Sequence, residues 1–196
     1  MRQDAQANKL AIMRTARAMI SRGDQGISMR AIAREAEVGI ATLSRHFPDR
    51  ASLIFAIMDD ALSDLAKVID NHLSGLNKNP KEEWPLTAHS IAKLGLPSLA
   101  EGLFTLVDIS AVDLENVHVR ARRDRLVELC EKLLEPVKDA ALVPQDLDPT
   151  QFYLGLAAAS RPLSPLAEIL VPGLHRWTVD TYLDGVRAQA TKQASQ

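Results

Sequence analysis

The sequence contains a single cysteine, Cys130, few aromatic residues and no long apolar run. One cysteine excludes an internal disulfide and favours a reducing compartment. Aromatic residues make up 4% of the chain, fewer than strand-rich folds usually carry. No apolar stretch approaches the roughly 18 residues of a membrane span, and the first six residues lack the apolar core of a signal peptide. These absences predict a cytoplasmic protein without a membrane partner.

The chain has 196 residues, of which 46% are hydrophobic and 24% are charged, and this balance is typical of a folded globular protein. Its net charge of −2 is unevenly distributed. Residues 1–50 carry nine Lys or Arg against five Asp or Glu, whereas the other 146 residues carry 14 against 20. A basic front end on an acidic body is typical of a polyanion-binding module joined to a second domain. An imbalance of this size also arises by chance.

Apolar residues recur at helical spacing along the whole chain, and no alternating strand pattern competes with them. Ser28 and Asp49 are suited to cap helix N-termini. The polar, breaker-rich residues 75–85 predict a loop, and residues 161–165, with two prolines, predict an interruption. The predicted helices cover residues 10–20, 29–36, 40–47, 50–73, 86–100, 103–111, 114–134, 149–159 and 174–189. The sequence therefore predicts an all-α fold.

Residues 28–47 carry the clearest functional signal, because two short helices joined by a three-residue turn form a helix-turn-helix. The leading residues of the second helix must be small to enter a major groove about 12 Å wide. Residues 39–42, Gly-Ile-Ala-Thr, meet this demand, while Leu43 and Phe47 anchor the helix from behind. A helical hairpin that only packs is the alternative. DNA reading is favoured, because the small residues leave little to pack.

Residues 27–53 resemble the DNA-binding domain of the tetracycline-repressor (TetR) family. The matching residues are Ser28, Ile32, Ala33, Ala36, Val38, Thr42, Leu43, His46, Phe47, Arg50 and Leu53, and the preceding helix matches through Ile12, Ala16 and Gly26. The resemblance implies a three-helix DNA-binding domain over residues 6–64, with its helix-turn-helix at 28–47. It also implies a helical effector-binding and dimerisation domain over residues 65–196.

The resemblance assigns roles at the DNA interface residue by residue. Ser28 and the amides after it would hold a phosphate, and Arg30 would reach the DNA backbone or a base edge. Ile40, Ala41 and Thr42 would face bases, and Arg45 would read guanine or contact a phosphate. The full predicted DNA-binding set is Ser28, Arg30, Gly39, Ile40, Ala41, Thr42, Ser44, Arg45, His46 and Arg50, in which His46 and Arg50 would grip the DNA backbone.

Three residues depart from the family pattern and bear on DNA affinity more than on the fold. Ser44 replaces a usual tyrosine and loses its reach and its aromatic packing. Glu37 replaces the usual glycine of the turn, where a left-handed backbone would cost about 1–2 kcal/mol. Gly39 replaces a serine cap, which costs little.

The body should hold a small-molecule pocket and a dimer interface if the resemblance extends to it. Pocket candidates, each also a candidate for core packing, are Trp84, Leu94, Leu103, Phe104, Val107, Phe152 and Leu156. A short reading helix covers few base pairs, so specificity requires two half-sites about 34–36 Å apart and hence a homodimer. The last two helices would form its interface, with Trp177, Tyr182 and Val186 as anchors or, alternatively, as core residues.

The remaining polar residues form no recognisable reaction centre. The histidines at 72, 89, 118 and 175 lack ligand spacing, so no metal site is expected, although His89 or His118 could line a pocket. Cys130 lies among leucines and is expected to be a core thiol. The arginines at 120, 122, 123 and 125 alternate with acidic residues, which predicts a solvated helix face. No catalytic constellation is present, so neither an enzyme nor a cofactor is expected.

The sequence thus predicts a transcriptional regulator, a repressor that a small-molecule effector releases from its DNA operator. The alternative, motivated by Glu37 and Ser44, is a helical small-molecule-binding protein with a degenerate DNA-reading head.

Overall fold

The structure is a computed structural model and describes residues 2–22, 24, 27–96, 99–100, 103, 113 and 115–193. Helices and their connections account for all of these residues, which confirms the all-α prediction. The helices are α1 (Arg2–Arg22), α2 (Met29–Glu35), α3 (Ile40–His46), α4 (Arg50–Lys78), α5 (Pro80–Ala92), α7 (Val117–Asp139), α8 (Pro149–Ala159), α9 (Pro165–Leu170) and α10 (Leu174–Gln193).

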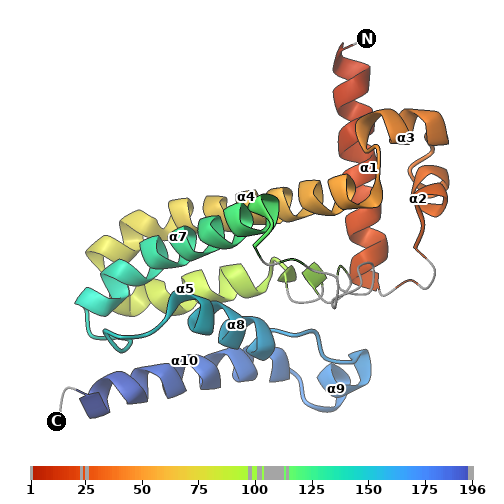
Figure 1. Ribbon diagram of the computed structural model, residues 1–196. Helices are drawn as coiled ribbons and strands as arrows, with labels where there is room; N and C mark the ends of the chain where they lie inside the picture. The colour runs from red at the N-terminus through yellow and green to blue at the C-terminus, as the bar shows by residue number, and fades with distance from the viewer. Residues whose placement is uncertain are drawn as a thin grey trace.

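Helices α1 to α3 gather at one end of the molecule, which we call the head, and α4 runs from the head along the rest (Figure 1). Helices α5 and α7 pack against α4, α8 packs on α7 and α5, and α10 packs on α5 and α8, and together these helices form the body. Two hydrophobic clusters follow this division. The head cluster includes Ile12, Ala16, Ile20, Ile32, Leu43, Phe47 and Leu53, and the body cluster includes Leu76, Trp84, Leu133, Phe152, Val179 and Leu183.

Helix α4 belongs to both clusters. Its first turns bury Leu53 and Ile57 in the head, and its later turns bury Leu65 and Ile69 in the body. The change of cluster falls just before the predicted domain boundary after residue 64. Because the helix is continuous through this point, the head is joined to the body by regular backbone and not by a loop.

The ends of the short head helices were predicted closely, whereas the loop predicted at residues 75–85 is wrong. Helix α4 continues to Lys78, and α5 begins at Pro80 after the single residue Asn79. Proline fits the first position of a helix, and Glu82 and Glu83 complement the positive end of the helix dipole. Pro85, the last residue of the predicted loop, and Pro136, just beyond the predicted helix end at residue 134, both lie inside helices.

Other helix boundaries also differ from prediction. Helix α1 begins at Arg2, well before residue 10, and ends at Arg22, and α5 ends at Ala92, before Gly95 adopts a positive φ of 65°. Helix α9 follows directly on the predicted interruption and was not foreseen. The helix predicted at 103–111 lies, apart from Leu103, outside the described residues. Within the described ranges no helix is long and apolar enough to cross a membrane.

Candidate nucleic-acid interface

The N-terminus of α2 is fixed by its own capping residue. Ser28 has extended backbone angles, and its Oγ accepts a hydrogen bond of 3.2 Å from the amide of Ala31. This is the geometry of an N-cap that satisfies one of the unpaired amides of the first turn. Ser28 and Arg30 both remain exposed, so they are accessible at this end of the helix. The prediction that they contact phosphate remains a prediction.

The turn between α2 and α3 explains the departure at Glu37. Glu37 has a φ of 55°, and its amide donates to the carbonyl of Arg34. The next amide, of Val38, donates to the carbonyl of Ala33 at 3.0 Å. These two bonds form the Schellman motif that ends many helices, in which the left-handed position usually holds glycine. The predicted left-handed turn is therefore confirmed, with a glutamate where glycine would be unstrained.

Helix α3 is held from behind and presents its other side to solvent. Leu43 and Phe47 are 0% and 2% exposed and belong to the head cluster. By contrast, Ile40 is 44% exposed, although it is a large apolar residue. Four other predicted DNA-binding residues of this segment are also exposed, Gly39, Ala41, Ser44 and Arg45, and two are half-buried, Thr42 and His46. The structure thus brings the predicted reading residues of α3 to one accessible segment.

Arg50 has a partner inside the protein. Its Nη2 donates a 2.7 Å hydrogen bond to the carbonyl of Ile27, which ties the start of α4 to the segment before α2. Asp49 caps α4 in a reciprocal box with Ser52, as the sequence predicted. Because one side of the Arg50 guanidinium is committed to this contact, Arg50 has a structural role that sequence reasoning missed.

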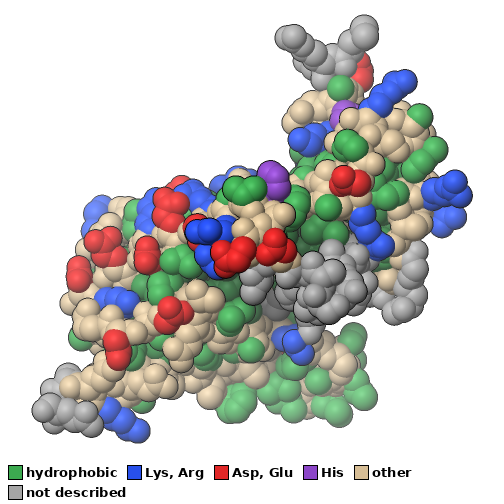
Figure 2. All heavy atoms as spheres, viewed as in Figure 1, with side chains coloured by type: hydrophobic (Ala, Val, Ile, Leu, Met, Phe, Trp, Pro, Cys, Tyr) green, Lys and Arg blue, Asp and Glu red, His purple; other side chains and the backbone are tan. Residues whose placement is uncertain are grey.

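Further arginines brace the head. The Nη2 of Arg22, at the end of α1, lies 2.7 Å from a carboxylate oxygen of Asp24 and 2.6 Å from one of Glu35 on α2. Hydrogen bonding to both carboxylates raises the pKa of Arg22, and the contact with Arg22 lowers the pKa of Asp24. Lys and Arg side chains are also visible over the outer side of the head (Figure 2). The exposed arginines of α1 to α3 include Arg14, Arg30, Arg34 and Arg45.

Two arginines form ion pairs with α4 at the segment where it passes from the head to the body. Arg17 of α1 reaches Asp60 and Asp64, with its Nη1 at 2.8 and 2.7 Å from the two carboxylates. From the body side, Arg122 of α7 lies 2.6 Å from Asp59, and its guanidinium carbon lies 4.3 Å from the centre of the Phe55 ring. The segment of α4 between the two clusters is therefore contacted from both the head and the body.

This result corrects one prediction for α7. Its arginines were expected to form a solvated helix face, but the Arg122 side chain is only 14% exposed. Arg120, Arg123 and Arg125 fit the prediction, since each is exposed and lies near an acidic residue of the same segment. Nothing local in the sequence distinguishes Arg122, because its partners on α4 lie more than 60 residues away.

The predicted pocket residues lie in packed regions. Trp84, Phe152 and Leu156 are buried in the body cluster, and Leu94 packs against it half-buried. Leu103 is buried in the head cluster instead, while Phe104 and Val107 lie outside the described residues. An open cavity of about 560 Å³ lies elsewhere, between α4 and α7, and its lining contains none of these residues. His118 does line this cavity, whereas His89 pairs with Asp180 of α10 at 2.7 Å.

The predicted dimer anchors divide into one exposed and two inward-facing residues. Trp177 is 61% exposed, but Val186 is buried, and the hydroxyl of Tyr182 donates a 2.9 Å hydrogen bond to the carbonyl of Phe152. Burial also raises the pKa of Tyr182 to about 12. Tyr182 and Val186 therefore take the core role, which the sequence left open. Large apolar residues of α8, of α9 and of the segments beside α9 are exposed as well, namely Leu154, Leu163, Leu166, Ile169, Leu170 and Val171.

Two smaller predictions concern metals and the thiol. In the portion of the chain that the structure describes, no group of three or more His, Cys, Asp or Glu could hold a metal ion. Cys130 is buried in the body cluster, as expected of a core thiol, and this burial raises its pKa to about 12.

Comparisons with known proteins agree with this geometry. Residues 12–57 match the family model described as bacterial regulatory proteins, tetR family. No curated protein matches the chain.

Solved structures with the same fold match nearly the whole chain. A TetR transcription regulatory protein from Mycobacterium vanbaalenii is 22% identical with a TM-score of 0.63, and the match covers 95% of this chain and 98% of that one. The TetR transcriptional regulator SCO0520 of Streptomyces coelicolor is 23% identical with a TM-score of 0.56, over 91% and 98% of the two chains. RolR in complex with its ligand resorcinol is 21% identical with a TM-score of 0.53, over 100% and 97%.

Proposed function

We propose that this chain, whose residues 12–57 match the family model of bacterial regulatory proteins of the tetR family, is a transcription regulator that binds a DNA operator as a homodimer. One observation carries the proposal, namely the two-sided character of α3. Its buried side holds Leu43 and Phe47, while its opposite side exposes Ala41 and Arg45, and Ile40 is exposed at the first turn of the helix. The exposed Ile40 side chain is placed to make apolar contact with a thymine methyl group in the major groove.

Residues of α3 would contact the bases, and residues on either side of them would contact the phosphate backbone and position the protein. Ile40 and Ala41 offer apolar contact to thymine, and Arg45 can donate two hydrogen bonds to guanine in the major groove. Ser44 offers a hydroxyl where a tyrosine is usual, so its contact would be shorter in reach. Around these residues, Ser28, Arg30 and His46 would contact the phosphate backbone, which fixes register and carries no sequence information.

A second copy of this chain would cover the exposed apolar surface at α9 and its neighbours. Figure 2 shows hydrophobic side chains gathered at the lower right, where Figure 1 places α9. Ile169 is 74% exposed and Leu170 is 71% exposed, and Trp177 follows at the start of α10. A contiguous apolar surface of this kind is typical of an interaction site. This proposal moves the dimer anchors from Tyr182 and Val186 to α9 and Trp177.

Regulation by a small molecule is part of the proposal. RolR, which has the same fold, is known in complex with resorcinol, and this supports a ligand-responsive role. We take the sign of regulation to be repression, with the effector lowering operator affinity. Effector and DNA would then weaken each other by the same factor, as thermodynamic linkage requires.

The test is a titration of the purified chain against the intergenic DNA beside its own gene, with random duplex of equal length as control, over a series of salt concentrations. We expect a saturable complex of two protomers per site with a steep salt dependence and a clear preference over random duplex. Equal, weak binding to both duplexes, followed by no enriched site in a genome-wide binding selection, would support the degenerate-head alternative and overturn the proposal.

The dimer surface has its own test in sedimentation analysis. Ile169→Asp places a charge in the apolar surface and is expected to shift the chain from dimer to monomer. Leu86→Asp, at another exposed leucine on α5, is the matched control and should leave the dimer intact. A dimer unaffected by Ile169→Asp would show that α9 lies outside the interface.

A further inference from the structure

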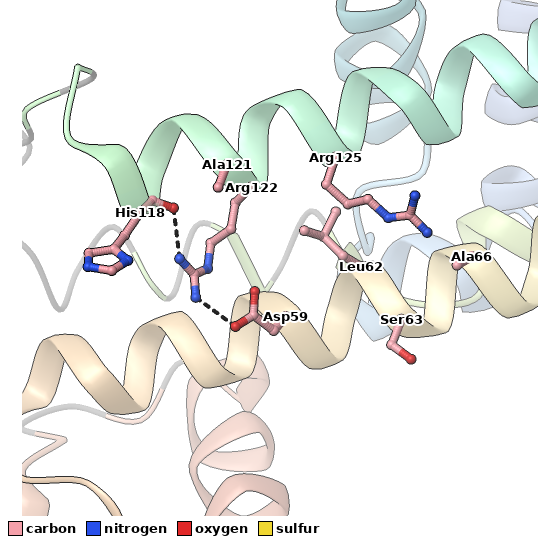
Figure 3. Close-up of a pocket in the computed structure, with 8 residues that line it drawn as sticks. All are labelled: Asp59, Leu62, Ser63, Ala66, His118, Ala121, Arg122 and Arg125. Carbon is pink, nitrogen blue, oxygen red and sulfur yellow. Dashed lines mark hydrogen bonds and ion pairs between the residues drawn. The ribbon is translucent and has the colours of Figure 1, made fainter.

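The cavity between α4 and α7 lies at the segment where the head joins the body. Figure 3 shows its lining side chains on two neighbouring helices that face each other. Helix α4 contributes Asp59, Leu62, Ser63 and Ala66, and α7 contributes His118, Ala121, Arg122 and Arg125. Its volume of about 560 Å³ lies within the range of small-molecule sites.

The lining has the chemistry of a site for an organic anion. The lining contains two arginines, Arg122 and Arg125, and a single carboxylate, that of Asp59, which Arg122 contacts. Leu62, Ala66 and Ala121 add an apolar wall. Arginine binds carboxylates through paired hydrogen bonds, and a cationic ligand would instead meet two positive charges here. A carboxylate attached to an apolar body therefore fits the lining best.

In the absence of such a ligand, the protein supplies its own carboxylate to Arg122. The Nη2 of Arg122 donates to Asp59 at 2.6 Å, and its Nη1 donates to the carbonyl of His118 at 2.7 Å (Figure 3). Each terminal nitrogen carries two hydrogens, so each retains one donor beyond these bonds. The Asp59 side chain is 57% exposed and can turn into solvent without leaving a buried charge. Arg125 likewise pairs with Glu128 at 2.7 Å, through an exposed contact.

We propose that this cavity is an effector site for a small organic carboxylate, which displaces Asp59 from Arg122 and thereby removes the ion pair that joins α7 to the head-to-body segment of α4. The site itself is inferred from its lining, whereas its regulatory consequence rests on the function proposed above. The displaced contact matters because Asp59 lies between Ile57, buried in the head, and Leu65, buried in the body. With Asp59 released, Arg122 would still contact the carbonyl and the ring of Phe55, and the ion pairs of Arg17 with Asp60 and Asp64 would remain on this segment.

The experiment uses benzoate and 2-naphthoate as probes, with benzamide and 2-naphthamide as neutral controls. Binding to the full chain is followed by methyl NMR, with Leu62, Ala66 and Ala121 as reporters in the cavity wall. Fragments of this size are expected to bind with a Kd of about 1–10 mM. We expect the carboxylates to shift the three reporter methyls and the amides to leave them in place. Absence of any shift at saturating carboxylate, or equal shifts with the amides, would overturn the site.

Two pairs of variants make the test specific. Asp59→Asn removes the internal competitor and is expected to tighten benzoate binding by about fivefold or more. Asp70→Asn is its matched control, because Asp70 forms another ion pair between α4 and α7, with Lys132 at 2.7 Å, outside the cavity lining. Arg125→Gln is expected to weaken binding by about tenfold, whereas Arg123→Gln, at a similarly exposed arginine outside the lining, should change it less than twofold. Equal effects within either pair would overturn the assignment.

The regulatory step is then read separately with DNA. Benzoate should raise the Kd of the wild-type chain for its operator severalfold, and lower concentrations should suffice for Asp59→Asn. Unchanged operator affinity at saturating benzoate would overturn the regulatory half of the proposal. Because the NMR titration contains no DNA, failure of operator binding altogether would overturn the proposed function while leaving the carboxylate site standing.

Discussion

Replacing Glu37 by glycine should stabilise the protein, although it removes a side chain. Glu37 occupies the left-handed position of the turn between α2 and α3, with a φ of 55°. A residue with a Cβ pays about 1–2 kcal/mol for this conformation, because the Cβ approaches the following carbonyl oxygen. Glycine lacks that contact, and both hydrogen bonds of the turn come from backbone amides that Glu37→Gly retains.

The gain is smaller than the strain it relieves. Glycine makes the unfolded chain more flexible, which offsets about 0.4–1 kcal/mol of the gain. The free energy of unfolding should therefore rise by about 0.5–1 kcal/mol. For a chain of this length, that corresponds to an increase in Tm of about 1–4 °C.

Urea unfolding, read by circular dichroism, measures this difference, and three variants isolate its cause. Glu37→Gln changes the charge but keeps the Cβ, so it should leave stability unchanged. Ala141→Gly tests the same backbone geometry at the end of α7, where φ is also 55° and no charge is lost. Ala18→Gly, at an exposed position inside α1, should instead destabilise by about 1 kcal/mol. If Glu37→Gly lowered stability as Ala18→Gly does, the strain assigned to this turn would be refuted.

Three further predictions follow from other parts of the molecule. Arg45→Ala should reduce discrimination at one base pair by about 1–3 kcal/mol in gel-shift titrations of operator variants, whereas a uniform loss across all duplexes would identify a phosphate contact instead. Gly155→Ala should lower the free energy of unfolding in urea by about 1–3 kcal/mol, because a Cβ there would lie 2.5 Å from the Tyr182 hydroxyl oxygen. An unchanged free energy of unfolding would mean that α8 and α10 move apart readily. The raised pKa of Cys130, about 12 against an ordinary 9.0, predicts a contribution to stability that is complete below about pH 9 and is lost as pH rises toward 12. Iodoacetamide should accordingly label the folded chain at pH 9 on the order of a hundredfold more slowly than the urea-unfolded chain, and equal rates would contradict burial.

The head was predictable from sequence because its determinants are local. Ser28 caps α2 through the amide three residues later, and Asp49 caps α4 through Ser52 in the same way. The burial of Leu43 and Phe47 follows from their spacing of four residues on one helix. The left-handed turn at Glu37 was foreseen only because the family pattern has glycine there. Each of these features is settled within a few residues of chain.

The body was less predictable, because its contacts join residues far apart in sequence. Arg122 resembles its neighbouring arginines until α4 places Phe55 and Asp59 beneath it. Tyr182 faces inward because the carbonyl of Phe152, 30 residues earlier, accepts its hydroxyl. The predicted loop at residues 75–85 failed for a different reason, since Pro80 starts a helix as readily as a proline elsewhere stops one.

The unbroken course of α4 makes it a lever. Its 29 residues span about 43 Å at about 1.5 Å per residue. A tilt of only about 5° at the body end would carry the other end by about 4 Å, close to the rise of one base pair at about 3.4 Å. In a dimer, two such levers set the distance between the reading helices. The contact between Asp59 and Arg122 lies along this lever, between its body end and the head, so a change at Asp59 would bear on where the head is held.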